Sequence, residues 1–70
     1  KLVVVGREKS GEVRMSLRCD VAPLAPAVQK ALVGIDGYGG GHEHACGAAV
    51  KKHDFERFLE NLRVELGLKA

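Results

Sequence analysis

The sequence has 70 residues, of which 46% are hydrophobic and 29% charged; this is the balance of one small folded domain and excludes a disordered tail. The net charge of +2 is too weak for a surface that coats nucleic acid unspecifically, so any anion must be bound by a few well-placed cations. Two cysteines cannot form a disulfide framework, which favours a cytoplasmic protein, and no apolar run is long enough for a signal peptide or a membrane span.

The first part of the chain predicts two strands joined by a turn. Lys1–Arg7 contains three consecutive valines and is apolar on both faces, so we expect a strand that is central or covered. Glu8–Gly11 is a polar turn. Glu12–Cys19 alternates between apolar and polar residues, the pattern of a strand with one buried face, and should form an antiparallel hairpin with the first strand. Its apolar set is Val13, Met15, Leu17 and Cys19.

A helix is predicted after the segment Asp20–Ala25. A start near Leu24 places Pro26 in the first turn, where the missing N–H of proline is tolerated. The helix should end at Gly34 or Gly37. Its apolar stripe then consists of Leu24, Val28, Ala31, Leu32 and Ile35.

The second half of the chain begins with glycines. Tyr38–Gly41 is predicted to be a glycine-rich loop, and His42–Cys46 a single helical turn. Gly47–Lys52 has small residues and ends in two lysines, which we interpret as a third strand. Asp54 should cap a second helix that ends at Gly67. The apolar residues of that helix are Phe55, Phe58, Leu59, Leu62 and Leu66.

This order of elements, β-β-α-β-α, predicts an α+β fold: a small mixed or antiparallel sheet with two helices packed on one face. Because the chain begins with Lys1 rather than Met, we expect residues 1–70 to be a single substrate-binding domain, a fragment of a larger protein.

The glycine-rich segment is the strongest candidate for a binding site. Gly39, Gly40 and Gly41 leave their backbone N–H groups unshielded, and such groups can converge on an oxyanion. The imidazole of His42 could donate a further hydrogen bond to phosphate. The alternative is a flexible surface turn that happens to be followed by a histidine.

A second candidate is the polar face of the second strand. Arg14, Ser16 and Arg18 are two residues apart, so two guanidiniums and a hydroxyl point the same way and could hold a phosphate. The alternative is an ordinary solvated strand face. Lys51 and Lys52 are a solvated strand end in the simpler interpretation, but they could also lengthen a phosphate track.

Metal binding and catalysis have less support. His42, His44 and Cys46 carry ligand atoms, with His53 nearby, but a zinc site usually shows paired ligands with a longer spacer, so a small metal-binding interaction domain is only an alternative. No activating arrangement makes Cys46 a nucleophile. Metal-dependent phosphodiester hydrolysis needs clustered carboxylates and histidines. The aspartates are scattered, at Asp20, Asp36 and Asp54.

Two segments together resemble a known family. Gly39–His42 followed by Ala45–Ala48 resembles the GGGHxxAAG-type motif of the C-terminal domain of DHH-family phosphoesterases, with Cys46 in place of the commoner alanine. Val13–Arg18 resembles that family's strand ending in Ser-x-Arg. The resemblance covers roughly residues 12 to 66. The amino-acid sequence of the motif is most similar to that of archaeal RecJ-like exonucleases.

The resemblance implies a function. Gly40, Gly41 and His42 would contact substrate phosphate, and Arg14, Ser16 or Arg18 would contact phosphate or nucleotide. The partners would be single-stranded DNA or RNA, or nucleotides, and the protein's own N-terminal catalytic domain, with no membrane partner. Catalytic manganese or magnesium would belong to that missing domain, so this chain would hold no cofactor and hydrolyse nothing alone.

A different class remains open. The C-terminal domain of alanyl-tRNA synthetases is a related tRNA-binding module with a glycine-rich segment. A histidine directly after the glycines, as at His42, favours the phosphoesterase branch.

Overall fold

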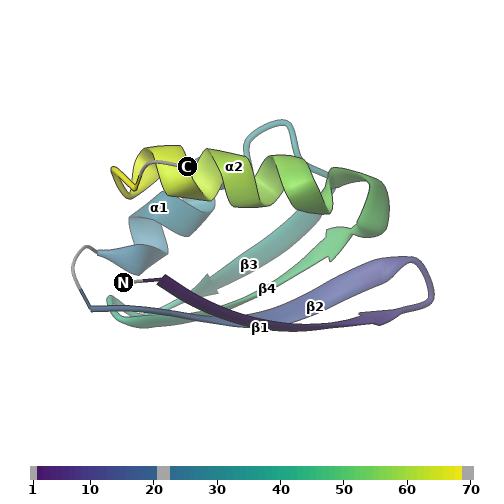
Figure 1. Cartoon of the computed structure of the whole chain (residues 1–70), viewed down its shortest axis with the longest axis horizontal. Coiled ribbons are helices and arrows are strands. Elements are labelled where there is room, and N and C mark those ends of the chain that lie inside the picture. Colours follow the sequence, from purple (N-terminus) through teal and green to yellow (C-terminus); the bar gives the residue numbers. More distant parts are fainter. Residues whose placement is uncertain (1, 21–22, 69–70) are drawn as a thin grey trace.

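The computed structural model describes residues 2–20 and 23–68 and confirms the α+β class (Figure 1). Four strands form one sheet in the order β1-β2-β4-β3, and every neighbouring pair is antiparallel. Both helices lie on the same face of that sheet, and the opposite face is left open (Figure 1). The elements are β1 (Leu2–Lys9), β2 (Glu12–Cys19), α1 (Leu24–Ala31), β3 (Gly37–Gly41), β4 (Ala45–Lys51), the short 3-10 turn η1 (Lys52–Asp54) and α2 (Phe55–Glu65).

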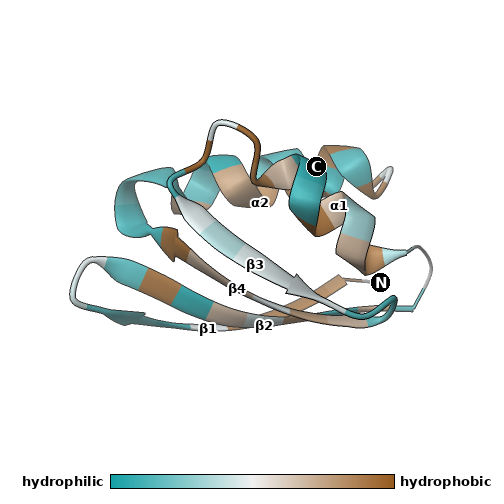
Figure 2. Cartoon of the chain, turned by 180° about the vertical axis from the view of Figure 1, so that it is seen from behind, coloured by the Kyte–Doolittle hydropathy of each residue, from teal (hydrophilic) through white to brown (hydrophobic). Residues whose placement is uncertain are grey.

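The β1–β2 hairpin forms as predicted, with a tighter turn. Ser10 and Gly11 both have positive φ, 55° and 76°, which is the conformation of a two-residue hairpin turn. The predicted turn at Glu8–Gly11 is therefore too long, because its first two residues still belong to β1. Along β2 the alternation is confirmed, and Figure 2 shows it as successive hydrophobic and hydrophilic bands. The four apolar residues named above are all buried.

The prediction that the first strand is central or covered is wrong. β1 is an edge strand, paired only with β2, because β2 uses its other side to pair with β4. Val3 and Val5 lie on the open face and are 45% and 67% exposed. Leu2 and Val4, on the side of the helices, are half-buried. A run of valines favours a strand, but it does not determine how many neighbours the strand has.

Helix α1 begins at Leu24, with Pro26 in its first turn, as the sequence predicted. It ends at Ala31, before Gly34, and the N–H of Leu32 still donates to the carbonyl of Val28. Two residues of the predicted lead-in, at positions 21 and 22, lie outside the described residues.

The glycine-rich segment is a strand, which corrects two predictions. Gly37–Gly41 forms β3 where a loop was expected, and residues 42–44 form a turn that is not helical before β4 begins at Ala45. The backbones of β3 and β4 come so close that a Cβ at Gly39 would lie 2.7 Å from the Gly47 carbonyl oxygen. Glycine usually weakens a strand, yet here its missing side chain is what permits the pairing.

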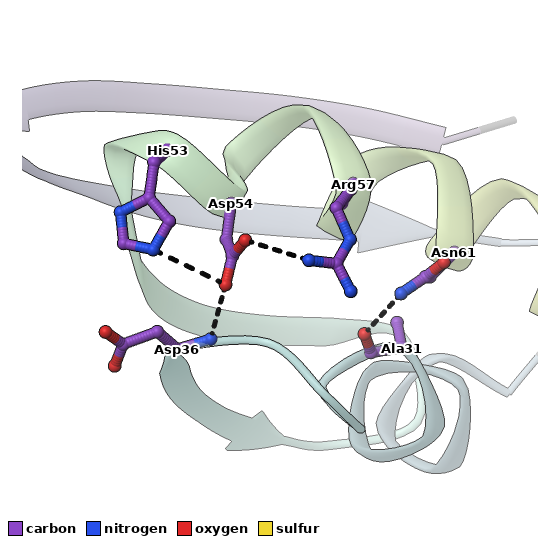
Figure 3. Close-up of polar contacts among 6 residues, drawn as sticks. All are labelled: Ala31, Asp36, His53, Asp54, Arg57 and Asn61. Carbon is purple, nitrogen blue, oxygen red and sulfur yellow. Dashed lines mark hydrogen bonds and ion pairs between the residues drawn. The ribbon is translucent and has the colours of Figure 1, made fainter.

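The core lies between the sheet and the two helices. Phe58 and Leu62 of α2 are fully inaccessible, and Asn61 donates from Nδ2 to the carbonyl of Ala31, 3.1 Å away, joining the two helices (Figure 3). Gly67 lies just beyond the end of α2, as predicted. Neither helix of the described ranges has the length and apolarity needed to cross a bilayer.

Asp54 occupies the position before α2, but its carboxylate does not cap the helix as predicted. Instead Oδ2 accepts a hydrogen bond from the backbone N–H of Asp36, at 2.8 Å, and Oδ1 accepts one from Nη1 of Arg57, at 3.3 Å (Figure 3). His53 Nε2 lies 3.8 Å from Oδ2. Asp54 is only 7% exposed, so these contacts compensate a buried charge and fasten the segment after α1 to the start of α2.

Candidate nucleic-acid interface

The open face of the sheet carries the polar residues that the sequence singled out on β2. Arg14, Ser16 and Arg18 are all exposed there, while the residues between them are buried toward the helices. β2 is an inner strand, between β1 and β4, so these three side chains stand in the middle of the open face. The strand therefore presents two guanidiniums and a hydroxyl on one surface, as the alternation predicted.

The register brings the glycine strand into line with these residues. Ser16 pairs with Gly47 of β4, and Gly47 pairs with Gly40 of β3. With ~4.8 Å between neighbouring strands, the backbones of Ser16 and Gly40 are about 10 Å apart. The residue between them is another glycine, so no side chain stands between the two.

Arg18 and His42 are aligned in the same way. Arg18 pairs with Ala45, and the N–H of His42 donates to the Ala45 carbonyl at 2.8 Å. The backbones of Arg18 and His42 are thus also about two strand spacings apart, ~10 Å. Both residues are exposed. Four of the site residues predicted from the sequence, at positions 16, 18, 40 and 42, therefore lie in two adjacent rows across the sheet.

The backbone N–H groups of the three glycines do not point toward one common site, as they would if this segment were a bend. The N–H of His42 donates to Ala45, and the N–H of Lys51 donates to the carbonyl of Asp36 at 2.9 Å, so these are hydrogen-bonded pairs of the β3–β4 ladder. By the alternation of antiparallel strands, the amide of Gly40 faces β4, whereas those of Gly39 and Gly41 face the free edge. The carbonyl of Gly39 also faces outward and accepts a 2.6 Å bond from Gln29 of α1.

A shallow hollow of about 210 Å³ lies on the open face beside the glycine strand. Its floor includes Gly47 and Ala49, and its walls include Arg14 and Tyr38. Tyr38 is 63% exposed, while Phe58 is fully buried, so Tyr38 is an accessible aromatic ring next to a guanidinium. Such a ring can stack on a nucleobase. Tyr38 was not among the site residues predicted from the sequence, although it lies directly before the three glycines.

The turn that carries His42 is held by the strand below it. The thiol of Cys46 donates to the carbonyl of His42, with Sγ and oxygen 3.4 Å apart. Burial raises the pKa of the Cys46 thiol, so the protonated, donating form is favoured. Cys46 thus stabilises the backbone that presents His42.

Three further contacts fix the same turn to other elements. The carbonyl of Glu43 accepts from the N–H of Leu24 at 2.7 Å, which ties the turn to the start of α1. The carbonyl of His44 accepts from the N–H of Cys19 at 3.1 Å, and Nδ1 of His44 lies 3.1 Å from the Cys19 carbonyl. The turn is therefore bound to α1 and to the end of β2, and His44 has a structural contact that the sequence did not predict.

The charges of the open face differ in how they are paired. Nε of Arg14 lies 3.2 Å from Oε1 of Glu12, so this guanidinium already has a carboxylate partner. Within residues 2–20 and 23–68, Arg18 takes part in no ion pair. Its charge remains available to a ligand, which makes Arg18 the stronger candidate of the two arginines.

The described part of the chain contains no group of three or more His, Cys, Asp or Glu side chains placed to hold a metal ion. Two of the ligand candidates from the sequence bond to protein instead: His44 contacts the Cys19 carbonyl, and the Cys46 thiol contacts the His42 carbonyl. His53 lies beside Asp54, near the start of α2. The described residues therefore do not favour the metal-binding alternative.

The sheet order and the two helices on one face define a small two-layer α+β domain, with the motif residues aligned on its open face. Residues 1–67 match the family model described as the DHHA1 domain. The chain therefore belongs to this family, the DHH-associated C-terminal domain of DHH phosphoesterases, and the resemblance seen in the sequence is confirmed. No curated protein matches the chain.

Proposed function

We propose that this domain binds phosphate groups of a single-stranded nucleic acid or nucleotide substrate, on behalf of a cytoplasmic RecJ-like exonuclease or related DHH-family phosphodiesterase. The observation that carries the proposal is the alignment of Ser16 and Arg18 with Gly40 and His42 on an uncovered sheet. Family membership supplies the association with phosphoesterases.

Each residue has a physical role in this proposal. Arg18 supplies a planar, permanently charged fork that can form two hydrogen bonds with phosphate oxygens. Ser16 supplies a hydroxyl from the next row. His42 supplies an imidazole, which binds phosphate more strongly when protonated. The glycines at positions 40 and 47 leave room for a phosphate or sugar to approach the backbone.

The hydrolytic chemistry is assigned to a separate domain. Manganese or magnesium in a phosphodiesterase is held by clustered carboxylates and histidines, and the described residues of this chain do not form such a cluster. In this proposal the chain positions the substrate, and an N-terminal catalytic domain holds the metal.

The variants Arg18→Ala and His42→Ala test the proposal directly. Each removes one charged or polar contact with phosphate, so each should weaken binding of a fluorescein-labelled single strand by about 1–3 kcal/mol, roughly 5- to 150-fold. Fluorescence anisotropy at low salt measures the affinity. Arg57→Ala, which removes a guanidinium on the side of the helices, is the matched control and should leave affinity unchanged. Equal affinity in all four proteins would reject the site.

A further inference from the structure

We propose that the end of the open face at the β1–β2 turn is a second phosphate-binding subsite, and that the ligand is therefore an oligonucleotide of several nucleotides rather than a mono- or dinucleotide. This inference rests on the proposed function, since it lengthens the same surface away from Arg18.

A hollow of about 460 Å³ lies at this end of the sheet. It is lined by Arg7, Lys9, Ser10, Glu12, Arg14 and Lys51. Four of these six side chains are cationic and one is anionic. The residues come from β1, β2, the turn between them and β4, so the sheet itself, and not a single loop, gathers the charge.

At this end of the sheet the register brings four cations around a single carboxylate. Arg7 pairs with Arg14, and Lys9 and Lys51 are the two partners of Glu12. Like charges in opposed positions of a sheet repel each other and destabilise it. The carboxylate of Glu12 is bonded to Arg14, at 3.2 Å. No ion pair in the described ranges involves Arg7, Lys9 or Lys51, and one carboxylate does not balance four cations, so a bound anion would reduce the repulsion between Arg7 and Arg14 and offset the excess positive charge.

The two ends of the open face are connected. Arg14 lines the hollow at the turn, the hollow beside Tyr38 and a third one that includes Ser16. Arg18 and Glu12 are six positions apart along β2, which corresponds to about 20 Å at ~3.3 Å per residue. A stacked single strand rises ~3.4 Å per nucleotide, so this path corresponds to about six nucleotides, and to fewer in an extended strand. A dinucleotide is too short to reach both ends.

The experiment compares the double variant Arg7→Ala/Lys51→Ala with the control Lys52→Ala. Lys52 follows Lys51 directly, but it lies with Phe55 and Leu59 on the side of the helices and pairs with Glu8, 3.4 Å away. Two labelled probes are titrated in anisotropy experiments at several salt concentrations: an oligothymidylate of about twelve nucleotides, twice the estimated span, and a 5′-phosphorylated thymidine dinucleotide. Thermal unfolding verifies that each variant is folded.

The proposal predicts that the 70-residue chain binds the longer strand at least ~10-fold more tightly than the dinucleotide. Arg7→Ala/Lys51→Ala should lower affinity for the longer strand ~10-fold and reduce the salt slope by ~1.4, which is ~0.7 for each of two lost phosphate contacts. Dinucleotide affinity should not change, and Lys52→Ala should behave as wild type with both probes.

Three results would overturn the subsite, and they separate it from the proposed function. If wild type binds both probes equally well, or if the double variant loses no more affinity than Lys52→Ala, the subsite is wrong while phosphate binding near Arg18 stands. If wild type binds neither probe, the proposed function fails together with the subsite.

Discussion

At the scale of single residues, Asp54 lies directly before α2 as predicted, but its carboxylate has a different hydrogen-bond partner from the one predicted. Its place before α2 was predicted from the usual preference for aspartate as a helix cap. The carboxylate instead accepts the Asp36 N–H, which belongs to the segment between α1 and β3. The choice between a local and a distant partner depends on tertiary packing, and nothing in the local sequence encodes it.

Asp54→Ala should therefore destabilise the whole domain. It removes the buried carboxylate that accepts hydrogen bonds from the Asp36 N–H and from Arg57, and the loss of these partners should cost about 1–3 kcal/mol in the free energy of unfolding. Urea unfolding followed by circular dichroism measures this. The matched control is Asp36→Ala, because the Asp36 carboxylate is exposed and points away from Asp54 (Figure 3). The control should change stability by less than ~0.5 kcal/mol, and an equal loss in both variants would contradict the account.

Cys46 gives a prediction about pH. Burial raises the pKa of its thiol above the ordinary value of 9.0. A group whose pKa is higher in the folded than in the unfolded state contributes stability that is present below the unfolded pKa and is lost as pH rises toward the folded pKa. Above pH ~9 the wild type should therefore lose unfolding free energy faster than Cys46→Ala, by at most ~1.4 kcal/mol per pH unit. Parallel pH profiles from urea unfolding would show that burial of this thiol has no such effect.

At the scale of elements, β3 is the strand that the sequence did not reveal. Five residues with four glycines have little strand propensity, so a loop was the natural prediction. What makes them a strand is the exposed ladder of β4, which offers hydrogen bonds at a distance too short for side chains on both partners. By contrast, β2 and both helices were predictable, because periodic burial leaves its pattern in the sequence.

The glycines of β3 should consequently differ in their tolerance of a methyl group. A Cβ at Gly39 would lie 2.7 Å from the Gly47 carbonyl oxygen, so Gly39→Ala must push the strands apart and should cost about 1–3 kcal/mol. A Cβ at Gly40 would meet only the flexible end of Gln29, at 3.6 Å, so Gly40→Ala should change stability by less than ~0.5 kcal/mol. Chemical unfolding of the two variants decides this, and equal stability losses would contradict the close approach at Gly39.

At the scale of the whole molecule, the two sides of the sheet have different roles: one forms the core with the helices, and the other carries the proposed binding site. The helices cover one side of the sheet (Figures 1 and 2) and supply the core, whereas Arg14, Arg18 and Tyr38 are exposed on the other side. The alternation along β2 predicted which residues share this face. It could not predict that His42 is aligned with Arg18 through Ala45, because that alignment depends on the register of β4 with both neighbours.

Residue-resolved mapping of a bound phosphate ligand tests the central claim most directly. In a titration of the ¹⁵N-labelled chain with a 5′-phosphorylated thymidine dinucleotide, the account predicts that NMR shift changes concentrate at Ser16, Arg18, Gly40 and His42. The chemical shifts of amides in α2, such as those of Leu59 and Arg63, should not change. Shift changes centred on α2, or none at ligand concentrations in the millimolar range, would contradict the claim that the open face of the sheet binds phosphate.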